Sequence, residues 1–142
     1  MKYFNFKGHN ISLKKINMLE TVVGINPQTN LKNYSITVHG TKSKHILKQF
    51  DFAHEAEFII EELGKSFNQN STLYANVNNE FLINIDNVLG LRLLRNSKNT
   101  LFTVELTFNN GEVFSLYTGT DESFALSLMK SYQDQEVEHY GL

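Results

Sequence analysis

The chain has 142 residues, of which 41% are hydrophobic and 12% aromatic, enough to build a packed core and to exclude wholesale disorder. It has no Cys, which excludes disulfides, thiolate metal sites and cysteine nucleophiles. No run approaches about 18 consecutive apolar residues, and the opening residues lack the apolar core of a signal peptide. We therefore expect a soluble cytoplasmic protein with no membrane-spanning helix.

The net charge of −2 hides an uneven distribution along the chain. Residues 1–50 hold eight Lys and a single acid, Glu20, so their net charge is +7, whereas residues 51–142 carry a net charge of −9. Such asymmetry is typical of a basic binding face, or of a basic half that packs against an acidic half.

The first half of the chain predicts four strands and then a helix. Apolar and polar residues alternate in each strand, and the alternation fails near Lys15, where we expect a bend or bulge. The only proline, Pro27, lies in an Asn-rich stretch that predicts a loop. The expected strands are 2–7, 11–23, 34–39 and 44–50.

The predicted helix begins after Asp51, whose carboxylate can accept hydrogen bonds from the first-turn amides as an N-cap. Apolar residues then recur at the spacing of one helical face, while the acids occupy the other faces. The expected apolar face consists of Phe52, Ala56, Ile59, Ile60, Leu63 and Phe67.

The second half repeats this order of elements. Strands are expected at 73–77 and 81–88, continuing through Leu91–Leu94, and then a hairpin over 102–117. Asn110-Gly111 predicts a two-residue type I′ turn in that hairpin. Thr120 is the expected N-cap of a second helix, with Phe124, Ala125, Leu128, Met129 and Tyr132 on its apolar side, and the polar residues 133–142 predict a frayed end.

The sequence therefore predicts an α+β protein made of two pseudo-symmetric ββββα repeats, residues 1–70 and 71–142. Each repeat would have an antiparallel sheet with a helix packed on it. A sheet left alone would expose one apolar face, so we expect the two repeats to form one compact unit. A homo-oligomer is also compatible with this pattern.

This order of strands and helices resembles two families of single-stranded nucleic-acid binders, the Whirly-type coactivators and the PUR-repeat proteins. The resemblance covers the whole chain and rests on topology, so it assigns no binding residues. The stretch Phe81-Leu82-Ile83-Asn84-Ile85-Asp86-Asn87-Val88 also looks like small proteins of phages and mobile elements in low-GC bacteria. That second likeness implies an origin and no activity.

Sequence motifs of enzymes are missing from the chain. It contains no nucleophile elbow, no phosphate-binding glycine loop and no compact His ligand spacing. His39 and His45 could meet across their hairpin, but a metal would need a third ligand from elsewhere. We therefore expect a non-enzymatic protein with no cofactor and no metal.

The lysines of the first repeat give the most concrete functional hypothesis. Lysines beside an exposed tyrosine on a sheet can bind single-stranded DNA or RNA by phosphate pairing and base stacking. The candidate residues are Tyr3, Lys7, Lys14, Lys42, Lys44 and Lys48. The alternative is a protein–protein interaction module, such as a phage-type accessory or inhibitor of a host factor, for which an apolar patch and a dispersed lysine set would be the signs.

Overall fold

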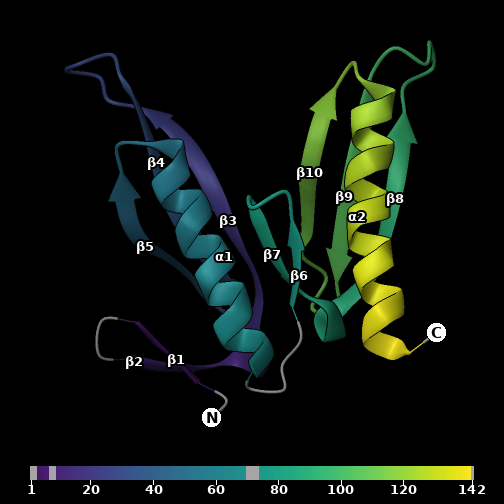
Figure 1. Ribbon diagram of the computed structural model, residues 1–142. Coiled ribbons are helices and arrows are strands. Elements are labelled where there is room, and N and C mark those ends of the chain that lie inside the picture. The colour runs from purple at the N-terminus through teal and green to yellow at the C-terminus, as the bar shows by residue number, and fades with distance from the viewer. Residues whose placement is uncertain (1–2, 7–8, 70–73, 142) are drawn as a thin grey trace. The chain divides into compact units, whose positions relative to one another are not determined.

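The computed structural model describes residues 3–6, 9–69 and 74–141 (Figure 1). It is an α+β protein with antiparallel sheets, as the sequence predicts. Contacts between residues divide it into two compact units, the first ending at Asn84 and the second beginning at Ile85.

The same order of elements occurs twice along the chain: a short hairpin, a 3-10 turn, three strands and a helix. The first series is β1 (Tyr3–Phe6), β2 (His9–Ser12), η1 (Leu13–Lys15), β3 (Ile16–Ile25), β4 (Lys32–Gly40), β5 (Lys44–Phe50) and α1 (Ala53–Gln69). The second series is β6 (Tyr74–Val77), β7 (Phe81–Asn84), η2 (Ile85–Asn87), β8 (Val88–Arg95), β9 (Phe102–Phe108), β10 (Val113–Gly119) and α2 (Glu122–Tyr140).

The first unit contains a five-stranded sheet in the order β5-β4-β3-β7-β6. β7 pairs with β3 at Met18, Leu19 and Glu20, so the hairpin that follows α1 completes the sheet that precedes it. The sequence predicts a division after residue 70, whereas the contacts divide the chain after Asn84 because of this pairing. The expected irregularity near Lys15 is confirmed as η1 and a register shift between Ile16 and Met18.

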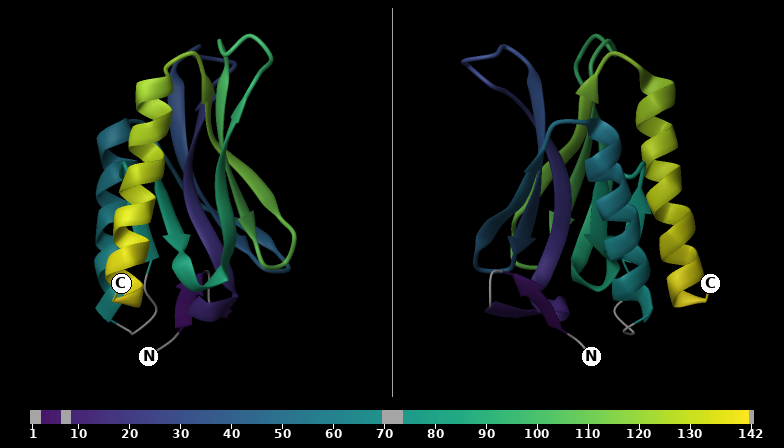
Figure 2. Two further views of the ribbon diagram at one scale, coloured as in Figure 1. Left: turned by 90° about the vertical axis from the view of Figure 1, so that its right-hand side faces the viewer. Right: turned by 60° about the vertical axis from the view of Figure 1, so that its left-hand side comes forward.

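Helix α1 packs along one face of this sheet (Figure 2) and covers the core of the first unit. The predicted face is confirmed at Ala56, Ile60 and Phe67, which are buried. Phe52 is an exception, because the helix begins one residue after it and its side chain is 61% exposed. Glu55 rather than Asp51 supplies the cap, since its carboxylate accepts a hydrogen bond from the Phe52 amide at 3.3 Å.

The second unit has a three-stranded sheet in the order β10-β9-β8. β9 buries every second residue, the period that the sequence shows. The predicted type I′ turn is wrong: of Asn110 and Gly111, only Gly111 has positive φ, at 90°. The Gly111 amide donates to the Phe108 carbonyl at 2.9 Å, and the Phe108 amide donates to Glu112, which makes a longer turn ending in a left-handed glycine.

Helix α2 extends further than predicted, through Tyr140. Its N-cap is Asp121, whose carboxylate accepts from the Phe124 amide at 3.0 Å, and not Thr120. The predicted frayed end is helical, and Gly141 closes it in the left-handed conformation with φ 70°. His139 also pairs with Asp86 at 2.9 Å, which ties the last turn of the helix to η2.

In the part of the chain that the structure describes, neither helix has the length and apolar composition needed to cross a membrane.

Candidate binding groove at the start of helix α1

A groove of the first unit lies between the loop that joins β3 to β4 and the start of α1. Its volume is about 560 Å³. Its lining combines bulky apolar side chains with polar and charged ones. It is lined by Asn26, Thr29, Leu31, Lys32, Asn33, Tyr34, Asp51, Phe52 and Ala53.

The loop wall of this groove is held in shape by Asn26. Its side-chain oxygen accepts from the Gln28 amide at 2.9 Å, and its main-chain amide donates to the Leu31 carbonyl at 2.8 Å. Asn30 takes the left-handed conformation with φ 56°, which Asn tolerates better than most residues. The sequence therefore builds a turn with its own hydrogen bonds rather than an unstructured connection.

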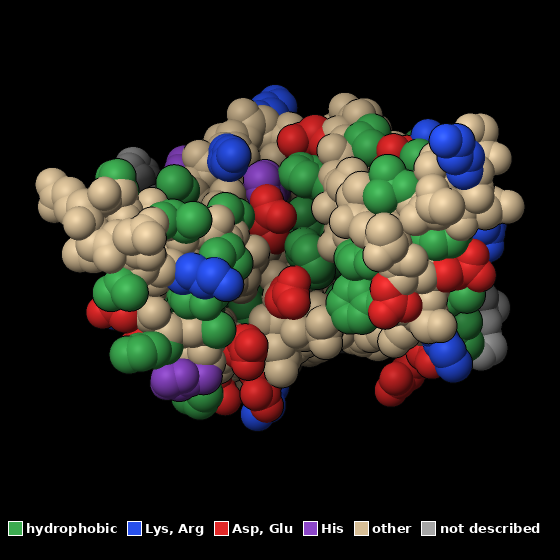
Figure 3. Space-filling model, turned by 90° about the horizontal axis from the view of Figure 1, so that it is seen from above, with side chains coloured by type: hydrophobic (Ala, Val, Ile, Leu, Met, Phe, Trp, Pro, Cys, Tyr) green, Lys and Arg blue, Asp and Glu red, His purple; other side chains and the backbone are tan. Residues whose placement is uncertain are grey.

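Large apolar side chains stand exposed around the groove. Ile25 is 64% exposed, Leu31 67% and Phe52 61%. Residues of these types are more often buried in a core. Figure 3 views the molecule from this end. Over the β3–β4 end of the first unit it shows several hydrophobic side chains and few lysines. Gathered exposed apolar groups are typical of an interaction surface.

A smaller pocket of about 130 Å³ adjoins the groove and shares Tyr34 and Ala53 with it. Its polar lining comes from Thr21, Glu57 and Glu80. Burial, together with the negative charge of Glu57, raises the pKa of the Glu80 carboxyl. Thr21 Oγ1 is buried and has no hydrogen-bond partner among the described residues. This pocket therefore presents the carboxylates of Glu57 and Glu80 to whatever enters it, while Thr21 Oγ1 lies buried in its wall.

The structure places the predicted nucleic-acid residues around the rim of the first unit rather than on one open sheet face. Lys42 and Lys44 lie at the β4–β5 turn and Lys48 on β5, all exposed, with Lys48 Nζ 5.4 Å from the centre of the Phe50 ring. Lys14 is exposed in η1. Lys7 lies outside the described residues.

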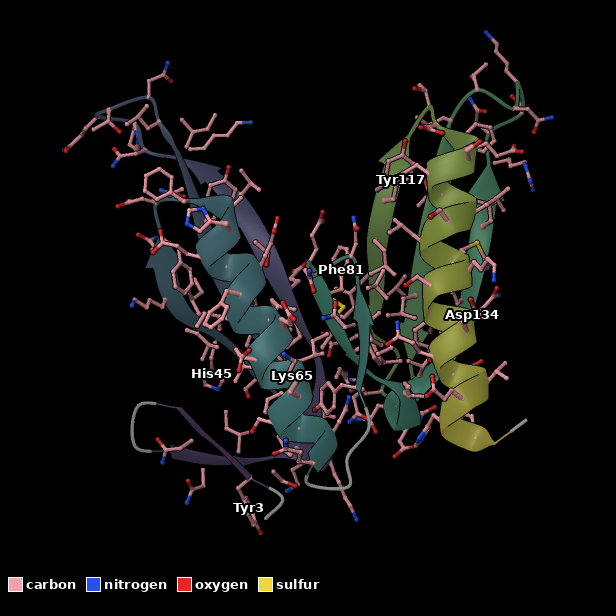
Figure 4. All side chains as sticks on the ribbon, viewed as in Figure 1. Tyr3, His45, Lys65, Phe81, Tyr117 and Asp134 are labelled. Atoms are coloured by element: carbon pink, nitrogen blue, oxygen red, sulfur yellow. The ribbon has the colours of Figure 1, made fainter. Side chains whose placement is uncertain are left out.

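Tyr3 stands apart from the lysines of β5. It is 54% exposed on β1, and Figure 4 shows its ring pointing away from α1. The exposed aromatic and the exposed lysines thus belong to different strands of different sheets.

The sheet face expected to carry the basic site is closed at its centre. Thr37 and His39 are buried, and His39 Nε2 lies 2.7 Å from Glu20 Oε1. His45 pairs opposite Val38, one position along from His39, so the two histidines lie on opposite faces and do not meet. Among the described residues, no group of three or more potential metal ligands occurs.

Comparison with protein-family models, curated proteins and solved structures found no match to this chain. The groove is thus judged by its geometry alone.

The sequence did not single out the groove residues. Leu31 lies in the Pro27 loop outside any helical or strand periodicity, and Phe52 fits the helical spacing although it precedes the helix. The signal that could have found the groove is a bulky apolar residue, Leu31, in an otherwise polar loop.

Proposed function

We propose that this protein is a non-enzymatic binding module that takes an exposed segment of a partner protein into the groove at the start of α1. The observation that carries the proposal is the apolar groove with exposed Leu31 and Phe52 at its edge. Recognition sites commonly combine apolar walls with placed polar groups, and this groove sets Leu31 and Phe52 beside polar loop residues.

The adjoining pocket defines the chemistry of that segment. The carboxylates of Glu57 and Glu80 can both accept hydrogen bonds, so a Lys or Arg side chain would pair with them and lower the repulsion between them. The partner segment should therefore carry a basic residue close to a bulky apolar one. Exposed apolar and aromatic anchors of this kind dominate binding energy at interfaces.

Selection from a displayed library of random peptides on the full-length protein would test this proposal. A labelled peptide from the enriched set would then be titrated by fluorescence anisotropy against the wild type and the variants Phe52→Ser and Glu80→Gln. We expect Lys or Arg beside Leu, Ile or Phe in the enriched peptides, and a loss of about tenfold in affinity for each variant. Glu112→Gln, a carboxylate remote in sequence from the groove, is the matched control.

Enrichment of acidic peptides, or affinity unchanged in both groove variants, would contradict the proposal. The anisotropy titration should also be repeated at high salt. The Glu80 contribution should shrink there while the Phe52 contribution persists, because salt screens charge and leaves apolar burial intact.

Single-stranded nucleic acid is the second candidate ligand. It is favoured by Lys42, Lys44 and Lys48, none of which has a carboxylate within ion-pair distance among the described residues, and by the resemblance to the Whirly-type and PUR-repeat families. Binding of a labelled oligonucleotide of about 20 nucleotides should weaken steeply with salt and vanish in a variant with all three lysines changed to Glu. Absence of binding at low salt would remove this candidate.

A further inference from the structure

The hairpins β1–β2 and β6–β7 both pair two strands of four residues end to end, with two residues between the strands in the first and three in the second. Tyr3 pairs with Ser12 and Asn5 with Asn10 in the first hairpin, and Tyr74 pairs with Asn84 and Asn76 with Leu82 in the second. Each hairpin runs directly into a three-residue 3-10 turn and then a long strand, β3 or β8.

β3 and β8 also correspond residue by residue. Both pair with the following strand through a register shift at the same place, between Ile16 and Met18 in β3 and between Val88 and Gly90 in β8. Gly90, Leu91 and Arg92 therefore occupy the positions of Met18, Leu19 and Glu20.

The two strands differ in what lies on their other edge. In β3, Met18, Leu19 and Glu20 pair with β7, and Leu19 is fully buried beside Leu82 in the core. Within the described residues, β8 pairs only with β9, and β1 and β2 pair only with each other. One sheet edge and one hairpin of matching form are thus left without the pairing that the first sheet shows.

β8 carries four leucines among its eight residues, and its two arginines, Arg92 and Arg95, are ion-paired within the second unit. Leu89 is 70% exposed, Leu91 is half-buried where its counterpart Leu19 is buried, and a side chain at Gly90 would meet no atom within 4 Å. A long apolar edge strand is a site for pairing with another chain unless it is covered.

We propose that the edge of β8 binds the β1–β2 hairpin of a second copy of this chain, with β2 antiparallel to β8. Transfer of the β3–β7 register places Gly90 opposite Ile11 and Leu91 opposite Asn10. The exchange is reciprocal in a two-fold dimer, because each copy supplies one hairpin and one edge. Each three-stranded sheet then becomes five-stranded, as the first sheet already is.

Disulfide trapping tests this pairing, since the chain has no native Cys. Two single variants, Ile11→Cys and Gly90→Cys, would be mixed in equal amounts and oxidised, and a second mixture would join Asn10→Cys with Leu91→Cys. We expect a disulfide-linked heterodimer in at least one mixture, because the two pairs sample both hydrogen-bonded and non-hydrogen-bonded positions of the ladder. The matched control mixes Ile11→Cys with Val113→Cys, which lies on the opposite edge strand β10.

Sedimentation equilibrium of the unmodified chain supplies the second measurement. We expect a dimer whose dissociation constant rises about tenfold in Leu89→Lys, with circular dichroism of the variant unchanged. The proposal would be overturned by a monomer at all concentrations, or by cross-linking no greater than in the Val113→Cys control. It would also be overturned if a double variant, Ile11→Cys/Gly90→Cys, formed its disulfide only within single chains.

Discussion

The Tyr74 hydroxyl donates a hydrogen bond of 2.8 Å to the main-chain carbonyl of Leu13, which lies 61 residues earlier in the chain. Asn84 Nδ2 donates to the same carbonyl and to that of Ile16, at 3.3 and 2.9 Å. Both donors are buried and come from β6–β7, while the acceptors are the first residue of η1 and the residue that follows it. The Leu13 carbonyl also accepts the Ile16 amide that closes η1, so these side-chain donors add buried hydrogen bonds to the end of the 3-10 turn.

Tyr74→Phe should therefore lower the free energy of unfolding by about 1 kcal/mol, the net value of one buried hydrogen bond. The double variant Tyr74→Phe/Asn84→Ala should lose more than the sum of the single changes, since the Leu13 carbonyl then loses both of its side-chain donors and keeps only the Ile16 amide. Urea denaturation would measure both, with Tyr3→Phe at an exposed position as the control. Strict additivity would show that the two donors do not share the carbonyl.

Stability should also fall above about pH 10, the ordinary tyrosine pKa. Burial raises the pKa of Tyr74 and of Tyr132 well above that value. The folded state then keeps protons that the unfolded state releases, so stability that is complete below pH 10 is lost as the pH rises. Denaturation midpoints between pH 8 and about 11 should decline less in Tyr74→Phe and Tyr132→Phe than in the wild type. A decline of the same slope in both variants would contradict this assignment.

Asp121→Ala should destabilise the second unit by about 1 kcal/mol, because it removes the acceptor for the Phe124 amide at the start of α2. Thr120→Ala is the matched control, one residue away and without that bond, and it should change stability little. Thermal unfolding followed by circular dichroism would compare the two. An equal loss in both variants would point to Thr120 as a second capping group.

Glu80→Gln should raise stability at pH 7. Burial and Glu57 raise the pKa of the Glu80 carboxyl, so the folded state binds its proton more tightly than the unfolded state does. The stabilising contribution is full below the unfolded value of 4.5 and is lost as the pH rises through the raised value. NMR titration of the Glu80 side chain should show a lower pKa in Glu57→Gln than in the wild type. If Glu80→Gln is more stable but binds peptide less well, the charge of Glu80 contributes to binding at a cost in folding stability.

The sequence predicted the elements whose burial is periodic. β9 alternates strictly because one face meets the core, and the inner face of α1 carries Ala56, Ile60 and Phe67 at helical spacing. Local patterns of this kind indicate which side of a strand or helix is buried, even when the element that packs against it is unknown.

The strand that pairs with β7 could not be predicted from such patterns. Phe81-Leu82-Ile83 reads as a strand in any sheet, and only the tertiary structure places it beside Met18 of β3. The end of α2 was missed for a similar reason, since polar residues gave no apolar stripe and the helix is held by a capping glycine and by the pair of His139 with Asp86. The groove depends on where a loop and a helix start meet, which no single stretch encodes.

The pairing of β7 with β3 also governs how the chain can be made. Strand β3 is complete by Ile25, yet the strand that closes its free edge ends at Asn84, so nearly sixty residues are synthesised between the two. A nascent chain that ends after α1 would present Leu19 on an open sheet edge. Its Leu13 and Ile16 carbonyls would also lack the hydrogen bonds from Tyr74 and Asn84. A fragment cut after residue 84 would carry the whole sheet, whereas one cut after residue 70 would leave that edge ready to pair with other chains.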